Sequence, residues 1–158
     1  MTQQEFLDYL YSFNPRHTKV LNLSNKELKH IPEDILRFEK LENLDLSYNE
    51  LSVLPPELFR LKRLRRLLVF KNQITEIGED LGALTHLELL DISYNRISIL
   101  PESIGKLTRL EVLDASNNEI ARLPLAMKDL KALKRLYLEE NKIKQMPEQL
   151  YNAGLGNI

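Results

Sequence analysis

The sequence contains no cysteine and no tryptophan among its 158 residues. Without cysteine, disulfide bonds and thiolate metal sites are excluded. Small secreted domains often depend on disulfides, whereas cytosolic proteins keep thiols reduced and rarely use them. The absence of cysteine therefore predicts a cytoplasmic protein.

An excess of charge of one sign is also lacking: 22 basic and 23 acidic residues give a net charge of −1. Proteins that bind nucleic acid or anionic membranes usually carry a basic excess, so we expect neither partner. No run of 18 apolar residues occurs, and the opening MTQQEFLDYLYSF lacks the basic and apolar regions of a signal peptide. We therefore predict neither membrane insertion nor export.

What the sequence does contain is a repeat of 23 residues, present in six consecutive copies. Its pattern is LxxLxLxxNxLxxLPxxLxxL, and positions 1, 4, 6, 11, 14, 18 and 21 are apolar in 41 of 42 cases, Thr18 being the exception. Units of this length cannot bury an apolar face alone, so they stack into a continuous core. The predicted repeats span 18–40, 41–63, 64–86, 87–109, 110–132 and 133–155.

Each repeat predicts one short strand and one helical return. Apolar residues alternate at positions 4 and 6, which places positions 3, 5 and 7 on the opposite face of the strand. Positions 15–23 begin with proline in five repeats and suit a helical or 3-10 return. The expected fold is an α/β repeat: a curved, right-handed solenoid with parallel strands on the concave face and the returns on the convex face.

The first 17 residues predict a cap for the first repeat. Thr2 and Glu5 can form a capping box, and Phe6, Leu10 and Phe13 share one face of a helix over 2–13. Such a helix would cover the exposed apolar end of the solenoid. Residues 156–158 are expected to form only the C-terminal end.

Position 9 is asparagine in five of the six repeats. A buried amide offers donors and an acceptor, so it can satisfy backbone groups where the strand bends into a loop. We interpret the column as a structural ladder. Its members are Asn49, Asn72, Asn95, Asn118 and Asn141, with Lys26 in the first repeat.

These segments, such as LSVLPPEL, ISILPESI and IARLPLAM, resemble the leucine-rich repeat family. The LP at positions 14 and 15 is similar to the 23-residue subclass of Ras-suppressor-type proteins, plant intracellular relatives and many bacterial proteins. The resemblance implies a scaffold that binds protein partners through its concave strands without catalysis. Three features depart from the family pattern: Lys26, Gly78 in place of proline, and no recognisable C-terminal cap.

Repeat three interrupts the polar columns that face away from the core. Where its neighbours have LDLSYN or LDISYN, it has LLVFKN, which puts Leu68 and Phe70 on a wall of aspartate and serine. Apolar groups beside arginine and tyrosine are typical of interface hot spots. The predicted partner site centres on Arg66, Leu68, Phe70 and Leu89, with Tyr48, Lys71, Tyr94, Val112, Arg135 and Tyr137 around it.

Other chemistry finds less support in the sequence. The basic run over 60–66 spreads over a return and a strand, and Arg65 lies between two glutamates of a cross-strand charge ladder. Asp91 and Asp114 on adjacent strands could stand at the spacing of paired glycosidase carboxylates, but no pocket is indicated. The three histidines are dispersed, so we predict no metal, no cofactor and no catalytic residue.

The sequence therefore predicts a non-enzymatic interaction module, a scaffold with a role in signaling, that binds a protein on its concave face. The alternative is a self-assembly module, a homodimer through an uncapped edge around 136–138, or a fragment of a larger signaling protein. Arg135, Tyr137 and Ile158 would contribute to that edge. The partner itself is not specified by the repeat.

Overall fold

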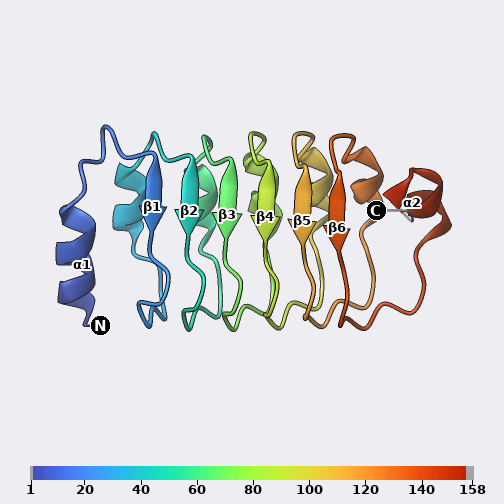
Figure 1. Cartoon of the computed structure of the whole chain (residues 1–158), viewed down its shortest axis with the longest axis horizontal. Helices are drawn as coiled ribbons and strands as arrows, with labels where there is room; N and C mark the ends of the chain where they lie inside the picture. The colour runs from blue at the N-terminus through green and yellow to red at the C-terminus, as the bar shows by residue number, and fades with distance from the viewer. Residues whose placement is uncertain (1, 156–158) are drawn as a thin grey trace.

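The computed structural model describes residues 2–155, which form a single solenoid with an α-helix at each end (Figure 1). Six parallel strands lie side by side in chain order and make one sheet. The predicted fold is confirmed. The strands are β1 (Val20–Asn22), β2 (Asn43–Asp45), β3 (Arg66–Leu68), β4 (Leu89–Asp91), β5 (Val112–Asp114) and β6 (Arg135–Tyr137).

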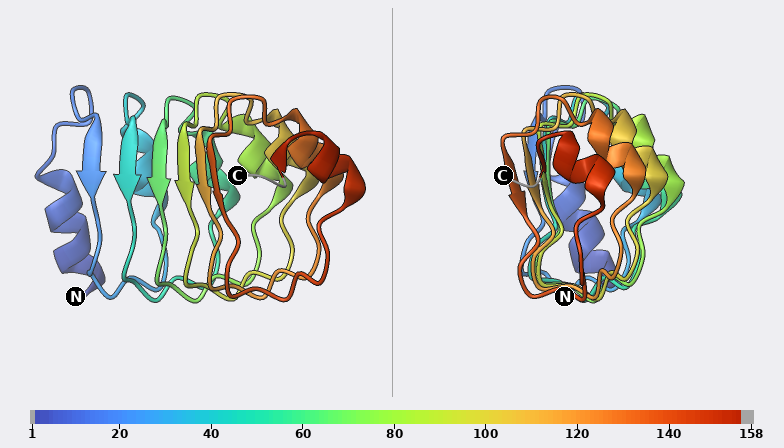
Figure 2. Two further views of the ribbon diagram at one scale, coloured as in Figure 1. Left: turned by 45° about the vertical axis from the view of Figure 1, so that its right-hand side comes forward. Right: turned by 90° about the vertical axis from the view of Figure 1, so that its right-hand side faces the viewer.

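The returns form a second wall opposite the sheet, as the view along the solenoid shows (Figure 2). Five of them are 3-10 helices and the sixth, α2 (Glu148–Asn152), is α-helical. Each begins after an extended residue at position 15, which proline favours because its φ is fixed. The 3-10 helices are η1 (Glu33–Arg37), η2 (Pro56–Arg60), η3 (Glu79–Ala83), η4 (Glu102–Lys106) and η5 (Leu125–Asp129).

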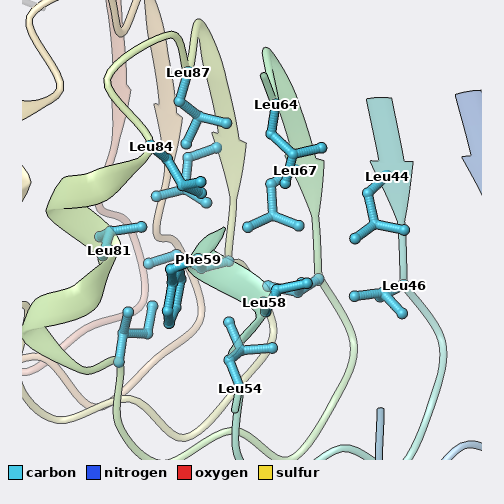
Figure 3. Packing of buried hydrophobic residues seen from close by; sticks show 14 of the residues in the cluster. Leu44, Leu46, Leu54, Leu58, Phe59, Leu64, Leu67, Leu81, Leu84 and Leu87 are labelled. Carbon is cyan, nitrogen blue, oxygen red and sulfur yellow. The ribbon is translucent and has the colours of Figure 1, made fainter. Parts of the chain in front are cut away.

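The core runs between the two walls as one continuous stack that is mostly leucine and isoleucine. Figure 3 shows part of it, from Leu44 to Leu87. In the first five repeats, every residue at the apolar repeat positions is buried except Thr18, which is half-buried. Only the last repeat is less covered, with Leu138, Ile143 and Met146 half-buried and Ala153 exposed. Burying each leucine or isoleucine contributes roughly 1.5–3 kcal/mol, so the stacking of repeats is the main source of stability.

Helix α1 (Gln3–Tyr11) covers the first repeat as predicted. The Glu5 N–H donates to the Thr2 hydroxyl and the Thr2 N–H donates to the Glu5 carboxylate, which completes the capping box. Phe6 and Leu10 are buried, and Phe13 packs partly against the core. The helix therefore closes the apolar end of the solenoid.

The asparagines at position 9 bond across repeats as well as within them. The Oδ1 of Asn95 accepts from the Ile74 N–H of the preceding repeat at 3.0 Å, and its Nδ2 donates to the Val69 carbonyl at 3.0 Å. Each of the five asparagines repeats this arrangement. The first repeat has no preceding repeat to reach, and there Lys26 places its Nζ 4.8 Å from the Tyr9 ring of α1 instead.

Contacts along the helical wall are features that the repeat pattern did not reveal. The Glu79 carboxylate accepts from the N–H groups of Glu102 and Ser103, which begin the next 3-10 helix. A Cβ at Gly105 would lie 2.5 Å from the Ala126 carbonyl oxygen, so only glycine permits this approach of η4 to η5. Position 19 holds the bulky Phe59 in repeat two, where it is buried in the core (Figure 3).

The last repeat is closed on its helical side and open on its strand side. Leu150 of α2 and Leu155 are buried, so α2 covers the end of the core. Ala115 and Asn117 of the preceding repeat donate N–H bonds to carbonyls of the last repeat. The equivalent N–H groups of Leu138 and Glu140 have no following repeat within residues 2–155. Residues 156–158, including Ile158, lie outside the described residues.

Candidate functional site

The outward-facing side chains of the sheet form a surface that we call the strand face. Its first row is position 3, and the register Asn43, Arg66, Leu89, Val112, Arg135 runs across adjacent strands. Its second row is position 5, where Leu68 pairs with Asp45 on one side and Asp91 on the other. The structure therefore puts Arg66 directly beside Leu89, and Leu68 between two aspartates.

Three of the six strands end in the same aspartate–serine turn. The Asp91 Oδ1 accepts from the Ser93 N–H at 3.0 Å and from the Ser93 hydroxyl at 2.7 Å. Repeats two and five form the same pair of bonds, and Asn22 takes the role of aspartate in repeat one. These polar side chains thus hold the chain as it leaves the strand.

Repeat three has no such turn, because Leu68 and Phe70 replace the aspartate and the serine. Both side chains are half-buried, as is Leu89. The Phe70 ring packs edge-on against the Tyr48 ring of the preceding repeat, with 5.1 Å between the ring centroids. Phe70 therefore has a partner within the chain and still presents part of its ring to solvent.

A row of aromatic and basic side chains borders this apolar group. The Lys71 ammonium lies 4.7 Å from the centre of the Tyr48 ring and 5.4 Å from that of Tyr94. It also donates to the Tyr48 hydroxyl at 3.3 Å. Tyr48 and Tyr94 remain 49% and 51% exposed, so both amphipathic rings are accessible to a partner at the edge of the strand face.

All three residues of this border have a left-handed backbone. The φ angles are 55° at Tyr48, 53° at Lys71 and 53° at Tyr94. Non-glycine residues with such angles are uncommon, and the conformation costs on the order of 1 kcal/mol or more. The same position is left-handed in every repeat, so the turn of the repeat imposes this geometry.

A shallow hollow of about 200 Å³ adjoins the apolar group on the strand face. Arg66 and Leu68 line one side of it. Among the described residues Arg66 forms no ion pair, so its guanidinium is available to an acidic group of a partner. The other lining residues are Val20, Leu21, Asn22, Asn43, Leu44 and Asp45.

The remaining predicted residues lie toward the C-terminal end of the strand face. Val112 is half-buried in the row of Arg66 and Leu89, and Arg135 is exposed beyond it. Tyr137 on β6 is 37% exposed and pairs in register with Asp114. The structure brings Tyr48, Phe70, Lys71 and Tyr94 together, whereas Arg135 and Tyr137 lie on β6, three strands away from β3.

The alternative chemistries are also placed by the structure. Arg65 donates to the Glu88 carboxylate at 2.6 Å and 3.0 Å, as the predicted charge ladder requires. Burial raises the pKa of Asp91, while the bonds from Ser93 act in the opposite direction and the nearby Asp114 carboxylate adds to the increase. Within residues 2–155, no cluster of three or more His, Cys, Asp or Glu side chains is arranged to hold a metal ion.

Sequence reasoning named the members of this site without showing how they interact. The stacking of Lys71 between two tyrosines depends on side chains 23 residues apart. The sequence does hold a signal for this arrangement, because position 8 of three successive repeats is Tyr48, Lys71 and Tyr94.

Comparison with known proteins agrees with this architecture. The leucine-rich repeat region model matches residues 73–155, and a leucine-rich repeat model matches residues 16–74. The chain therefore belongs to the leucine-rich repeat proteins, whose repeats commonly bind proteins and are typically non-enzymatic. The sequence matches none of the curated proteins with which it was compared.

Several solved structures have the same fold. A leucine-rich repeat protein of Leptospira interrogans is 31% identical with a TM-score of 0.86, over 93% of this chain and 37% of its own. Internalin C2 of Listeria monocytogenes is 28% identical with a TM-score of 0.75, over 84% of this chain and 56% of its own.

The plant peptide hormone receptor RGFR1, solved in complex with RGF2, is 28% identical with a TM-score of 0.71, over 78% of this chain and 20% of its own. All three chains are therefore much longer than the part that the present chain matches. No helix within residues 2–155 is long and apolar enough to cross a membrane.

Proposed function

We propose that the chain is a non-enzymatic scaffold whose strand face binds a protein partner at repeat three. The observation that carries the proposal is the replacement of the aspartate–serine turn by Leu68 and Phe70. The site combines a partly exposed apolar pair, two amphipathic tyrosines and Arg66, which has no acidic partner within residues 2–155. This is the composition of a binding hot spot. A peptide-binding role is compatible with the fold, since the similar plant peptide hormone receptor RGFR1 was solved in complex with RGF2.

The proposed contact has a centre and a border. Leu68, Phe70 and Leu89 would be covered by apolar side chains of the partner, while Arg66 would meet an acidic group. Tyr48, Lys71 and Tyr94 would form the border that excludes water, and Val112, Arg135 and Tyr137 would extend it toward the C-terminal strands. We also propose that the chain belongs to the 23-residue subclass and has a role in signaling. The proposal includes a cytoplasmic location, because the sequence has no cysteine.

A variant that turns repeat three into an ordinary repeat tests the proposal directly. Leu68→Asp with Phe70→Ser restores the sequence pattern of repeats two and four, so we expect the solenoid to fold with nearly unchanged thermal stability. Loss of the apolar centre should weaken binding of the captured partner by roughly 30-fold or more. The measurements are affinity capture from source-cell lysate, followed by calorimetric titration with the purified partner.

A matched control makes the same kind of change outside the proposed contact. Ile99 is 70% exposed and lies outside the six strands and outside the hollow lined by Arg66, so Ile99→Asp replaces an exposed apolar side chain by an acid elsewhere. It should retain the partner. Equal affinity of the folded double variant and the wild type would contradict the proposal.

Self-association through β6 is the second candidate. It is favoured by the N–H groups of Leu138 and Glu140, which donate to no backbone carbonyl within residues 2–155. An unpaired strand edge is a template for another strand. A homodimer would appear in light scattering as a mass that doubles with concentration, and Tyr137→Asp with Leu138→Pro should abolish it. A monomer at every concentration would exclude this candidate.

A further inference from the structure

The loops that lead into the strands carry a second column of charged residues, at position 23 of the repeat. These loops lie along one rim of the solenoid, at the top in Figure 1. Arg63, His86 and Arg109 follow one another in three consecutive repeats and line a common hollow of about 250 Å³ with Glu42 and Arg65. We call this hollow the basic rim.

The acidic residues near the basic rim already have basic partners. Glu42 pairs with Lys19 at 2.9 Å and Glu88 pairs with Arg65 at 2.6 Å. Farther along the rim, Glu111 pairs with Lys134 at 2.9 Å. At position 2 of the repeat, each glutamate thus forms an ion pair with a lysine or an arginine of the adjacent repeat. The charges of position 23 are left outside this pairing.

Within residues 2–155, neither Arg63 nor Arg109 forms an ion pair. Two repeats separate them, which corresponds to roughly 10 Å between their backbones. The hydrogen bond from Lys19 lowers the pKa of Glu42 and the charge of Arg63 adds to this effect, but the Arg63 guanidinium makes no direct bond to that carboxylate. The basic rim therefore has two guanidinium groups in excess of its carboxylates.

His86 stands between the two arginines in a fixed orientation. Its Nδ1 lies 3.1 Å from the Lys62 carbonyl oxygen. Because a carbonyl can only accept a hydrogen bond, Nδ1 carries the proton and donates, which leaves Nε2 as the other polar atom of the ring.

We propose that the basic rim binds a compact dianion of the phosphate class, held between the guanidinium groups of Arg63 and Arg109. A guanidinium offers paired N–H donors that match the oxygens of a phosphate group. The hollow, of about 250 Å³, is large enough to admit a phosphate group. Extended polyanions are disfavoured for two reasons. The glutamates Glu42, Glu88 and Glu111 lie along the same edge of the solenoid as the arginines, and the chain has a net charge of −1.

Two sources share this chemistry: free phosphate and the phosphorylated side chain of a protein. The first probe is inorganic phosphate, added to the full ¹⁵N-labelled chain at constant ionic strength with sodium chloride as compensation. We expect the side-chain Nε–H resonances of Arg63 and Arg109 to shift and saturate. Shifts that sodium chloride reproduces, or that never saturate, would overturn the proposal.

Three variants test the assignment to these residues. Arg63→Gln with Arg109→Gln should lower the phosphate affinity by roughly tenfold or more, because two charge-assisted contacts are lost. Lys128→Gln with Lys144→Gln removes the same charge from exposed positions elsewhere and should leave the affinity unchanged. Glu42→Gln removes the one carboxylate of the hollow and should increase the affinity. An equal loss in both double variants would reduce the effect to net charge and overturn the site.

A second probe distinguishes the two sources. A short peptide containing O-phosphoserine is compared with inorganic phosphate and with the same peptide unphosphorylated. Tighter binding of the phosphopeptide assigns the basic rim to a modified protein partner, and equal binding of phosphopeptide and phosphate assigns it to the free anion. Binding of the unphosphorylated peptide with the same affinity as the phosphopeptide would contradict the proposal.

Discussion

Repeat three differs from its neighbours at three places that the others keep nearly constant. Repeats two, four and five end their strands with an aspartate that accepts two bonds from serine, whereas repeat three has Leu68 and Phe70 there. It also has Gly78 where the others have proline. Its core residues and Asn72 nevertheless have the same burial and backbone bonds as their counterparts.

This difference separates what the solenoid requires from what it tolerates. The inward-facing leucines and the asparagine ladder bond or pack across repeats, so each repeat depends on them. The aspartate–serine turn acts within one strand end and can be replaced without loss of the fold. A position that the fold does not require can change to serve binding instead. The change at Leu68 and Phe70 is therefore the basis for proposing repeat three as the binding site.

The largest expected effect comes from breaking a feature that repeat three shares with its neighbours. Asn95→Ala would leave the buried Ile74 N–H without its acceptor, and the Val69 carbonyl would keep only the bond from the Asn72 amide. We expect the free energy of unfolding to fall by about 1–3 kcal/mol. Denaturant titration measures the change.

Lys26→Ala at the same repeat position provides the comparison. Its side chain contacts the Tyr9 ring and reaches no preceding repeat, so the loss should be at most about 1 kcal/mol. Similar losses for Asn95→Ala and Lys26→Ala would show that the ladder is not the cause.

A smaller change in the free energy of unfolding, of opposite sign, is expected at Gly78. There repeat three differs from the proline of the other repeats on the helical wall. Gly78 has φ −71° and ψ 163°, close to the φ −70° and ψ 148° of Pro101 in the next repeat. A Cβ at Gly78 would meet only the Asp80 carboxylate, at 3.9 Å. Gly78→Pro should therefore stabilise the chain by about 0.4–1 kcal/mol, by restricting the unfolded state.

The reverse substitution in repeat four sharpens this prediction. Pro101→Gly should destabilise the chain by a similar amount, and the melting temperatures of the two variants should move in opposite directions. A decrease with Gly78→Pro would indicate that repeat three has a backbone need for glycine.

The smallest expected effect concerns Asp91, which lies in register with Leu68. Burial raises its pKa above the ordinary value of 3.8, so the folded chain holds the proton more tightly than the unfolded chain. Stability from this group is therefore greatest at low pH and is lost as pH rises through the folded pKa. Asp91→Asn keeps the acceptor for Ser93, as Asn22 shows for Ser24.

We expect Asp91→Asn to be slightly more stable than the wild type at pH 7, and this advantage to disappear below the ordinary aspartate pKa. Thermal melts across pH measure the difference. Lower stability of the variant at pH 7 would mean that the carboxylate charge itself strengthens the turn.

The sequence predicted most of the fold and part of the candidate site. Period, strand positions and the cap by Phe6 and Leu10 follow from local patterns, because the same spacing recurs in every repeat. The stacking of Lys71 on two tyrosines and the close approach at Gly105 could not be predicted, since each depends on side-chain positions between neighbouring repeats. The contiguous basic run over 60–66 did not indicate that Arg63 and Arg65 line one hollow with Arg109, because Arg109 lies two repeats further along the chain.

By itself, the sequence determined that this chain stacks 23-residue units with parallel strands on one wall, since burial of the repeated leucines has no other solution. Only the tertiary structure decided which free side chains meet. Stacking places residues 23 positions apart within contact distance, and their rotamers, ion pairs and exposure depend on both neighbours at once. For this reason Tyr48, Phe70 and Lys71 form one surface. For the same reason Arg63 and Arg109 line one hollow without forming an ion pair within residues 2–155.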